Sequence, residues 1–366
     1  MLRLVSYRGI LAGLAAGLLL VVACKPDLDV EGPAITTPYA YDPIPRGFPA
    51  LAAPADNPTT VEGVALGRRL FYDKQLSATG TQSCGSCHQQ RKAFTDGLAR
   101  SVGVDGRPHP RNSMSLTNIV WDQHLTWDGA NTLLEQQARV PIENPLEMHQ
   151  SLAEGVRKLQ QNEQYPPLFR RAFGSARISE ENVLKALAQF ERTLVSTNSR
   201  YDRFVAGDRT ALSQEAISGF ALFNTHAVPG RRGAECFHCH VPPTFSAPRG
   251  EFFNNGLDLT FPDPGRNGVT GLPADLGKFK APTLRNIALT APYMHDGRFQ
   301  TLEQVLDHYS DHVQVTPTTD GNLAVSTNHP SGRMSLSATE KRQIIAFLHA
   351  LTDSTFIADP RFAAPN

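Results

Sequence analysis

Two short segments of the sequence carry the same pattern of cysteines and histidine. The pattern C-x-x-C-H occurs at 84–88 and at 236–240, and it uses all but one of the five cysteines. In c-type haem attachment, the two thiols of this pattern form thioethers with the porphyrin and the adjacent histidine binds the iron. Zinc binding is the alternative, but each cluster would then need a partner C-x-x-C or H-x-x-x-H nearby, which the sequence lacks. The sequence therefore predicts two covalent haems, held by Cys84, Cys87 and His88 and by Cys236, Cys239 and His240.

The fifth cysteine, Cys24, follows a segment typical of secretory signals. Two arginines precede an apolar run at 10–23, which is short compared with the roughly 20 residues that span a membrane. A cysteine directly after a small residue is typical of bacterial lipoproteins, and ordinary cleavage with Cys24 left as a free thiol is the alternative. We predict a signal peptide at 1–23 and a lipid anchor on Cys24. Because no Asp follows the cysteine, the expected location is the periplasmic face of the outer membrane.

Three segments of strong helical periodicity are expected to build the framework around the motifs. Apolar residues recur at helical spacing behind Ser179, Ser213 and Ser337, and serine is suited to cap a helix N-terminus. Glu340 completes a capping box with Ser337. The stripes are core positions: Val183, Leu187, Phe190 and Leu194; Ala216, Ile217, Phe220 and Phe223; Ile344, Ile345, Leu348 and Leu351. Strand-like alternation is scarce, so a mostly α fold whose long loops wrap the haems is predicted.

A second repeat precedes both motifs. G-x-x-L-F occurs at 67–71 and at 219–223, at equal distances before Cys84 and Cys236. This repeat predicts one cytochrome c-like haem domain duplicated, although a short apolar motif can also recur by chance. The predicted division is a Pro-rich extended tether at 24–60, an N-terminal domain at 61–205, a C-terminal domain at 206–354 and a tail at 355–366. Basic and acidic residues balance at 35 each, which argues against a nucleic-acid partner and still permits a charged patch for docking a redox protein.

Four further blocks are interleaved with the motifs. They are Pro-Arg-Asn-Ser at 110–113, Leu-Thr-Trp-Asp-Gly at 125–129, Pro141 with Leu-Glu-Met at 146–148, and a long block at 281–298. With these blocks, the stretch from Val64 to Thr352 resembles the bacterial di-haem cytochrome c peroxidase and MauG family. The resemblance implies that the N-terminal haem, on His88, reacts with H2O2. It implies that the C-terminal haem, on His240, transfers electrons.

The resemblance also implies roles for residues near the first haem. Glu147 matches a carboxylate that takes a proton from one oxygen of H2O2 and returns it to the other. Gln137 and Pro141 resemble residues that line the same pocket. Trp127 matches a tryptophan between the two haems, where an indole can carry an oxidising equivalent. Without the surrounding motifs, Glu147 would be read as a surface carboxylate and Trp127 as a packing residue.

A calcium site between the domains is a further implication. Asn112, with the backbone carbonyls of Thr290 and Pro292, matches the family's calcium ligands. Oxygen ligands from a side chain, carbonyls and water suit a hard cation. One Ca2+ is therefore expected in addition to the two haems.

Two positions depart from the pattern of the family's cytochrome c peroxidases. Those enzymes carry a histidine that caps the first haem, and Val104 stands in its place. Val104 predicts an iron with one open position, which can react with peroxide. His109 is nearby, and we expect it to face solvent in a loop.

The second departure lies opposite the C-terminal haem. Tyr309 stands where those peroxidases have a ligating Met, and MauG-like members have Tyr in this place. Methionine raises the reduction potential of the iron, whereas an anionic phenolate stabilises its higher oxidation states. His308 is the competing ligand, but it lies roughly 100° around the same helix, so only one of the two can face the haem.

Six further histidines are expected to have no role at the haems. His238 lies inside the second motif, next to the iron ligand His240, and is expected to face solvent. No spacing signal marks the five others: His124, His149, His226, His312 and His329.

These features favour a peroxidase of the MauG-like branch. Such an enzyme would use H2O2 to oxidise residues of a partner protein, typically Trp. One alternative is a cytochrome c peroxidase that removes H2O2 with electrons from a small cytochrome or cupredoxin. The other is a di-haem electron carrier without enzymatic activity, against which Glu147 and the missing capping histidine argue.

Overall fold

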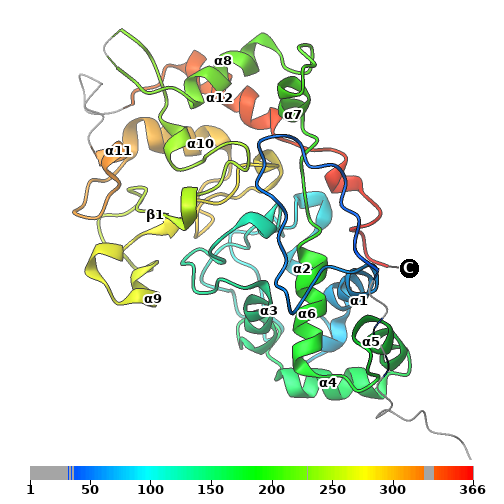
Figure 1. Ribbon diagram of the computed structural model, residues 1–366. Helices are drawn as coiled ribbons and strands as arrows, with labels where there is room; N and C mark the ends of the chain where they lie inside the picture. Colours follow the sequence, from blue (N-terminus) through cyan, green and yellow to red (C-terminus); the bar gives the residue numbers. More distant parts are fainter. Residues whose placement is uncertain (1–31, 33, 35–36, 229, 325–333, 366) are drawn as a thin grey trace, which may run out of the picture.

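The structure is a computed structural model that describes residues 32, 34, 37–228, 230–324 and 334–365, and it is mostly helical (Figure 1). The predicted signal peptide, Cys24 and His329 lie outside the described residues. Two short antiparallel strands, β1 (Phe252–Phe253) and β2 (Phe279–Lys280), pair with Phe252 opposite Lys280. The longer α-helices are α1 (Val61–Tyr72), α3 (Leu134–Glu143), α4 (Leu152–Gln161), α5 (Tyr165–Phe173), α6 (Glu180–Glu191), α8 (Gln214–Phe223) and α12 (Ala338–Ala350). The shorter α-helices are α2 (Cys84–Cys87), α7 (Arg200–Val205), α9 (Asn267–Thr270), α10 (Leu302–Asp307) and α11 (Gly321–Ala324).

The three helices predicted from periodicity are confirmed. Ser179 caps α6, and its side chain accepts a hydrogen bond from the backbone N–H of Asn182. Ser213 caps α8 in the same way, and Ser337 forms the predicted capping box with Glu340 at α12. These caps satisfy backbone donors that have no partner within the first turn. The apolar stripe of α6 is fully buried, as expected for core positions.

The buried side chains form two large clusters, one in each half of the chain. The first surrounds the packing of α1 against α6, and the second surrounds that of α8 against α12. In Figure 1, α1–α6 occupy the lower part of the molecule and α7, α8, α10 and α12 the upper part. The first cluster draws on residues 64–194 together with Phe356 and Phe362, and the second on residues 201–351. A mostly α fold is thus confirmed, whereas the predicted domain boundaries and the duplication stay predictions.

The G-x-x-L-F glycines sit at equivalent helix contacts in the two halves. A Cβ atom at Gly67 would collide with the backbone carbonyl of Ala186 in α6. A Cβ atom at Gly219 would collide with the backbone carbonyl of Gln343 in α12. In both halves, glycine therefore lets the helix before the haem motif approach its partner helix closely. This shared contact gives the sequence repeat a structural reason.

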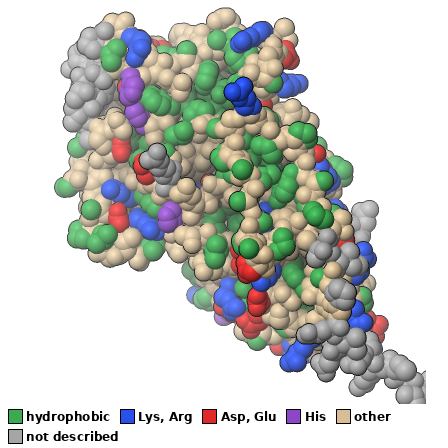
Figure 2. Space-filling model, in the orientation of Figure 1, with side chains coloured by type: hydrophobic (Ala, Val, Ile, Leu, Met, Phe, Trp, Pro, Cys, Tyr) green, Lys and Arg blue, Asp and Glu red, His purple; other side chains and the backbone are tan. Residues whose placement is uncertain are grey.

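Residues 37–60, predicted as an extended tether, lie against the folded body. They form no helix, as expected, but they cross both halves of the molecule in Figure 1, and apolar side chains gather in that region in Figure 2. Asn57 is buried and accepts a hydrogen bond from Gln189 of α6 at 2.9 Å. Asp42 pairs with Arg361 near the C-terminus. Tertiary contacts thus hold a segment whose composition alone indicates an isolated linker.

The predicted tail at 355–366 also belongs to the folded body. Phe356 and Phe362 are buried in the N-terminal cluster. The hydroxyl of Tyr72 donates to the carbonyl of Phe362 at 2.7 Å, and the Gln90 side chain donates to the carbonyl of Asp359 at 2.8 Å. The end of the chain therefore returns from the C-terminal half to complete the core of the N-terminal half.

A fully buried arginine joins several of these segments. The guanidinium of Arg285 donates two hydrogen bonds of 2.7 Å to the carboxylate of Asp202 in α7. It donates a third, of 2.8 Å, to the carbonyl of Pro243. The ring of Phe48, from the N-terminal segment, lies 4.7 Å from the guanidinium carbon. A buried charge is tolerated here because the pair is bidentate and further hydrogen-bonded.

Among the described residues, the longest helices fall short of the length and apolar character that crossing a membrane requires.

Candidate haem-binding sites

The N-terminal motif begins on the single turn of α2 and ends at His88. The backbone N–H of Ser83 donates to the hydroxyl of Ser86, which fixes the start of this turn. His88 Nδ1 lies 2.8 Å from the carbonyl oxygen of Phe94. Because a carbonyl only accepts, Nδ1 carries the hydrogen and Nε2 keeps its lone pair for a metal. Burial lowers the pKa of His88 from its ordinary value, which favours the neutral, metal-binding imidazole.

The cysteines of both motifs are free thiols and suit covalent attachment better than zinc binding. Burial, assisted by the nearby Asp96 carboxylate, raises the pKa of Cys87 to about 11, so the thiol is neutral. Burial likewise raises the pKa of Cys236 to about 12. Within the described part of the chain, the cysteine sulfurs and the iron-binding histidine of each motif take part in no metal-binding cluster. The residues present thus fit thioether attachment of a haem and do not fit the zinc alternative.

Glu147 lies beside the N-terminal motif. Helix α3 ends at Glu143, and the following turn brings Glu147 back, where its carboxylate accepts a hydrogen bond of 2.8 Å from the Asn144 side chain. The backbone N–H of Val104 donates to the carbonyl of Glu147 at 2.9 Å, so the two positions lie side by side. Burial lowers the pKa of His88, whereas the hydrogen bond to Phe94 and the negative charge of Glu147 raise it. The Glu147 carboxylate therefore contributes to the electrostatic surroundings of His88.

His109, predicted to face solvent from a loop, is partly exposed and lies beside Glu147. Its side chain is 26% exposed, and its Nε2 lies 3.6 Å from the Glu147 carboxylate, which is 30% exposed. His109 Nδ1 lies within hydrogen-bonding distance of the backbone of Arg111, which holds the ring in place. The loop at 103–109 packs closely on the Glu147 turn, because a Cβ atom at Gly103 would collide with the carbonyl of Leu146. The site thus combines a carboxylate and an imidazole that are both open to water.

Gln137 and Pro141 lie one turn apart on the same face of α3. The carbonyl of Pro141 accepts a hydrogen bond from the backbone N–H of Met148, directly after Glu147. The Gln137 side chain accepts one from Asn131 at 2.8 Å. The structure therefore ties Pro141 to the Glu147 turn, while the hydrogen bond of Gln137 leads to the loop before α3.

The C-terminal motif is a single 3₁₀ turn, Cys236–His238, followed by His240. His240 Nδ1 lies 3.1 Å from the carbonyl oxygen of Pro282 and 3.3 Å from that of Phe245. As at His88, these carbonyls leave Nε2 free for a metal. Burial lowers the pKa of His240 to about 4, so the imidazole is neutral. A cavity of about 190 Å³, lined mainly by apolar side chains, adjoins this histidine.

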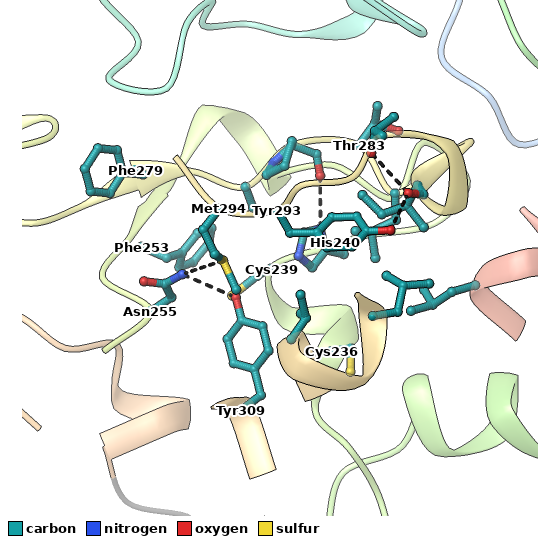
Figure 3. A pocket seen from close by; sticks show the side chains of 18 of the residues that line it. Cys236, Cys239, His240, Phe253, Asn255, Phe279, Thr283, Tyr293, Met294 and Tyr309 are labelled. Carbon is teal, nitrogen blue, oxygen red and sulfur yellow. Dashed lines mark hydrogen bonds between the residues drawn. The ribbon is translucent and has the colours of Figure 1, made fainter. Parts of the chain in front are cut away.

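Tyr309 points into this cavity (Figure 3). His308 is not among the residues that line it. Helix α10 passes into a π-helical turn at His308–His312, and such turns redirect side chains at functional sites. The Tyr309 hydroxyl accepts a hydrogen bond of 3.5 Å from Asn255, and burial raises the pKa of Tyr309 above its ordinary value. His308 Nε2 instead lies 2.9 Å from the backbone carbonyl of Asn255. The geometry thus supports Tyr309 over His308 as the residue that faces the haem site.

Trp127 lies where the two halves meet. Its indole N–H donates to the carbonyl of Asn112 at 2.9 Å, and its own carbonyl accepts from the backbone N–H of Lys280 in β2 at 2.8 Å. The side chain also lines the cavity beside His240. The predicted position between the two haem sites agrees with these contacts, while the role of Trp127 stays a prediction.

The three residues proposed for calcium line the same cavity: Asn112, Thr290 and Pro292. The backbone N–H of Asn112 donates to the carbonyl of His295 at 2.7 Å, which brings the N-terminal segment to the 290–295 loop. The set offers neutral oxygens only, so a Ca2+ ion would need several waters to reach six to eight ligands. These oxygens would suit such an ion with a partly hydrated shell, and the calcium site stays a prediction.

Three further residues were missed or misjudged from the sequence. Asn255 and Met294 reach the cavity from loops, where no spacing signal marks them. His238, expected to face solvent, is only 22% exposed and lies 2.9 Å from the carboxylate of Glu235. In these cases the position depends on loop conformation, which local patterns do not encode.

Comparisons with known proteins agree on one family. A family profile described as di-haem cytochrome c peroxidase matches residues 61–210. The chain is 39% identical over 303 residues to the methylamine utilization protein MauG of Methylorubrum extorquens, covering 81% of this chain and 80% of the relative. It is 33% identical over 302 residues to the cytochrome c551 peroxidase of Nitrosomonas europaea, with 81% and 82% coverage. Among solved structures, a MauG-like protein associated with microbial copper homeostasis matches with a TM-score of 0.76 and 38% identity, covering 89% of this chain and 99% of that one.

Proposed function

The chain belongs to the di-haem cytochrome c peroxidase and MauG family, and we propose that it is a MauG-like peroxidase that oxidises residues of a partner protein. Family members are oxidoreductases, so the chain is a haem peroxidase with two c-type haems. The finer assignment rests on Tyr309, which lines the C-terminal cavity beside His240 and stands, by the family resemblance, where the cytochrome c peroxidases have a ligating methionine. Because an anionic oxygen ligand stabilises oxidised iron, this side chain suits a site that retains oxidising equivalents.

We assign proton transfer at the N-terminal site to Glu147. The haems, when bound, supply the iron that takes up the two oxidising equivalents of H2O2. A Glu147 carboxylate oxygen accepts a proton from one peroxide oxygen and returns it to the other, which then leaves as water. The hydrogen bond from Asn144 orients this carboxylate. Val104 lacks a side-chain nitrogen, so it leaves the approach of peroxide open.

His109 connects Glu147 to solvent. Its Nε2 is 3.6 Å from the carboxylate, and both side chains are partly exposed. An imidazole at this distance can pass protons between the carboxylate and water. We assign His109 to this proton supply.

Trp127 and Tyr309 act on the oxidising equivalents. Trp127 bridges Asn112 of the N-terminal half and Lys280 of the C-terminal half, so its indole offers a route between the two sites. Overall, H2O2 takes two electrons and two protons to give two waters. The electrons come from the partner, whose oxidised side chains are tryptophans in our proposal.

A cytochrome c peroxidase is the second candidate. The 33% identity to the Nitrosomonas europaea peroxidase supports it. That enzyme class draws its electrons from the metal centre of a small redox protein and leaves no protein side chain oxidised. The two candidates differ in how long the enzyme keeps its oxidising equivalents.

One experiment separates the candidates. The holoprotein receives one equivalent of H2O2 in the presence of a reduced small cytochrome c, and the absorbance of both is followed. The proposal predicts a change in the enzyme's haem absorbance that lasts for minutes while the cytochrome stays reduced. Rapid oxidation of the cytochrome would favour the second candidate, and a complete lack of reaction would favour an electron carrier.

We extend the proposal to the calcium ion and the location. Asn112 and the carbonyls of Thr290 and Pro292 would hold Ca2+ between the halves. The signal-like segment at 1–23 and Cys24 support a lipid anchor on the periplasmic face of the outer membrane. Metal analysis and mass spectrometry of the membrane-extracted protein test these two assignments.

A further inference from the structure

A group of three potential metal ligands lies outside the haem sites. His226 Nδ1, Glu235 Oε2 and His238 Nε2 converge on one point at the surface of the C-terminal half. Glu235 and His238 flank Cys236 of the second motif, whereas His226 comes from the loop after α8. His240 has other partners, because its Nδ1 faces the carbonyl of Pro282. The three residues therefore form a site of their own beside the haem motif.

The spacing of the three atoms matches a metal coordination shell. Glu235 Oε2 lies 3.0 Å from His226 Nδ1 and 2.9 Å from His238 Nε2. The two histidine nitrogens lie 3.3 Å apart. Tetrahedral ligands at roughly 2.0–2.1 Å from an ion such as Zn2+ stand about 3.3 Å from one another. An ion just above the triangle would thus reach all three atoms with small movements.

Hydrogen bonding alone leaves the three contacts unsatisfied. The ionised carboxylate of Glu235 only accepts, so each histidine nitrogen must carry a hydrogen to bond it. The two N–H groups would then oppose each other across the 3.3 Å contact between the histidines. If either nitrogen gives up its hydrogen, it loses its bond to Glu235. A cation that accepts a lone pair from all three atoms removes this conflict.

The loop that carries the ligands is already folded around the site. The backbone N–H of Ala227 donates to the second carboxylate oxygen of Glu235 at 2.6 Å, which orients that side chain. The backbones of Val228 and Arg231 exchange two hydrogen bonds, and the backbone N–H of Ala234 donates to the carbonyl of Leu222 at 2.8 Å. Glu235 itself has a φ of +57°, a conformation that costs energy for a non-glycine residue. This strain places its carboxylate toward both histidines.

We propose that His226, Glu235 and His238 bind one divalent first-row transition metal ion, Zn2+ or Cu2+. Two imidazoles and one carboxylate suit such ions, and Cu2+ binds such a set more tightly than Zn2+. The His226 side chain is 53% exposed, that of His238 22% and that of Glu235 11%. The ion therefore enters from solvent and keeps at least one open position for water or for a ligand from a partner.

Metal titration of the holoprotein tests the site without any peroxide reaction. Untagged protein is treated with a chelator, desalted and titrated calorimetrically with Zn2+ and, separately, with Cu2+. The expected result is one ion per chain for either metal. X-ray absorption at the zinc edge should show two imidazole ligands at roughly 2.0–2.1 Å.

Two variants and a matched control locate the binding. Since even outer-shell partners change metal affinity by roughly 10–100-fold, loss of a ligand in His226→Ala should weaken binding by at least about 100-fold. Glu235→Gln, which keeps the size of the side chain, should weaken it by a similar factor. In the control, His149→Asn removes another exposed histidine, whose Nδ1 meets the single carboxylate of Asp105 at 2.8 Å, and asparagine tolerates the φ of +50° there. This control should bind as the wild type does.

The proposal fails if the wild type binds neither ion at one per chain. It fails equally if His226→Ala binds as tightly as the wild type does. Haem content, measured for every variant, shows whether the second motif was matured normally. Because the readout is metal affinity, this result is independent of the proposed peroxidase function.

Discussion

Both haem-attachment motifs hold their histidine in the same way, but the residues around the two sites differ. At each motif, Nδ1 of a buried histidine meets a backbone carbonyl, that of Phe94 for His88 and that of Pro282 for His240. On the side of the N-terminal motif lie Glu147 and His109, whose polar side chains are partly exposed to water. The C-terminal site meets a largely apolar cavity that Tyr309 enters.

This difference indicates a division of labour between two similar attachment sites. Peroxide cleavage needs protons, and protons come from titratable groups with access to solvent. Retention of oxidising equivalents needs the opposite, because water and small donors must be kept away. The common part of each site fixes the haem, and its surroundings decide the chemistry.

The largest effect is expected from Glu147→Gln. The amide cannot take a proton from peroxide and return it, so the rate of reaction with H2O2 should fall by roughly 10²–10⁴-fold. Stopped-flow absorbance of the haems measures this rate. Glu154→Gln, an exposed carboxylate paired with Arg157, should react as the wild type does. If Glu147→Gln reacts at the wild-type rate, Glu147 does not transfer the proton during peroxide cleavage.

Tyr309→Met should convert the C-terminal site toward the peroxidase pattern. Both haems should stay attached, while the reduction potential of one rises by on the order of 100 mV or more, within the roughly 0.8 V that axial ligands span. Redox titration followed by absorbance measures this shift. His308→Gln is the matched control, because His308 faces the carbonyl of Asn255 outside the cavity. If the control shifts the potential and Tyr309→Met does not, the ligand assignment is reversed.

Gly67→Ala and Gly219→Ala compare the helix contacts of the two halves. Each added methyl group would collide with a backbone carbonyl, so each variant should lose about 1–3 kcal/mol of stability. Thermal unfolding of the holoprotein measures the loss. Gly321→Ala, where a Cβ atom meets open space, should stay within about 0.5 kcal/mol of the wild type. Unequal losses at the two glycines would weaken the argument for equivalent packing.

His109→Gln should slow the peroxide reaction by roughly tenfold, or about 1.4 kcal/mol, because Glu147 loses its proton supply. Free imidazole in the buffer should restore part of the rate, which a purely structural loss would not permit. His312→Gln, an exposed histidine far from Glu147 in sequence, is the control. No rate change in His109→Gln would leave Glu147 to exchange protons with water directly.

The smallest effect concerns the helix caps. A hydrogen bond from Arg232 lowers the pKa of Glu340 to about 2. The Arg232–Glu340 pair therefore stabilises the fold fully above the ordinary carboxyl pKa of 4.5, and this stabilisation is lost as the pH falls toward 2. Because Arg232 is 45% exposed, Glu340→Gln should cost no more than about 1 kcal/mol at neutral pH.

The N-terminal half provides the comparison for this cap. Ser179→Ala removes the cap of α6, which ends its first turn with Asn182 and has no carboxylate at that position. It should cost about 1 kcal/mol at every pH. Denaturant unfolding between pH 3 and 7 should therefore distinguish the two variants. The stability cost of Glu340→Gln should shrink as the pH falls from 4.5 toward 2, whereas that of Ser179→Ala should stay constant. Parallel pH dependence would contradict the role of the Arg232 pair.

The helices could be predicted from the sequence because their signals are local. The caps at Ser179, Ser213 and Ser337 and the apolar stripes behind them lie within a few turns of each other. The two haem motifs are local for the same reason. The fold class therefore followed from short patterns.

The surroundings of the sites could not be predicted in the same way. His109 meets Glu147 only because two loops pack together, and Asn255 reaches Tyr309 from a loop distant in sequence. A His-Glu-His cluster arises where the loop after α8 folds back on the second motif. These contacts depend on loop conformations that tertiary packing selects, so residue spacing carries no record of them.

The segment at 37–60 has a consequence for the order in which the molecule is completed. The hydrogen bond between Asn57 and Gln189 joins positions 132 residues apart, and that between Asp42 and Arg361 joins positions 319 residues apart. Contacts between such distant positions form late, because a long loop must close first. We expect both motifs to stay accessible to the haem-attachment machinery until the segment at 37–60 packs against the two halves. Protease cleavage within 37–60 should therefore be faster in protein without haem than in the mature form, and equal rates would contradict this order.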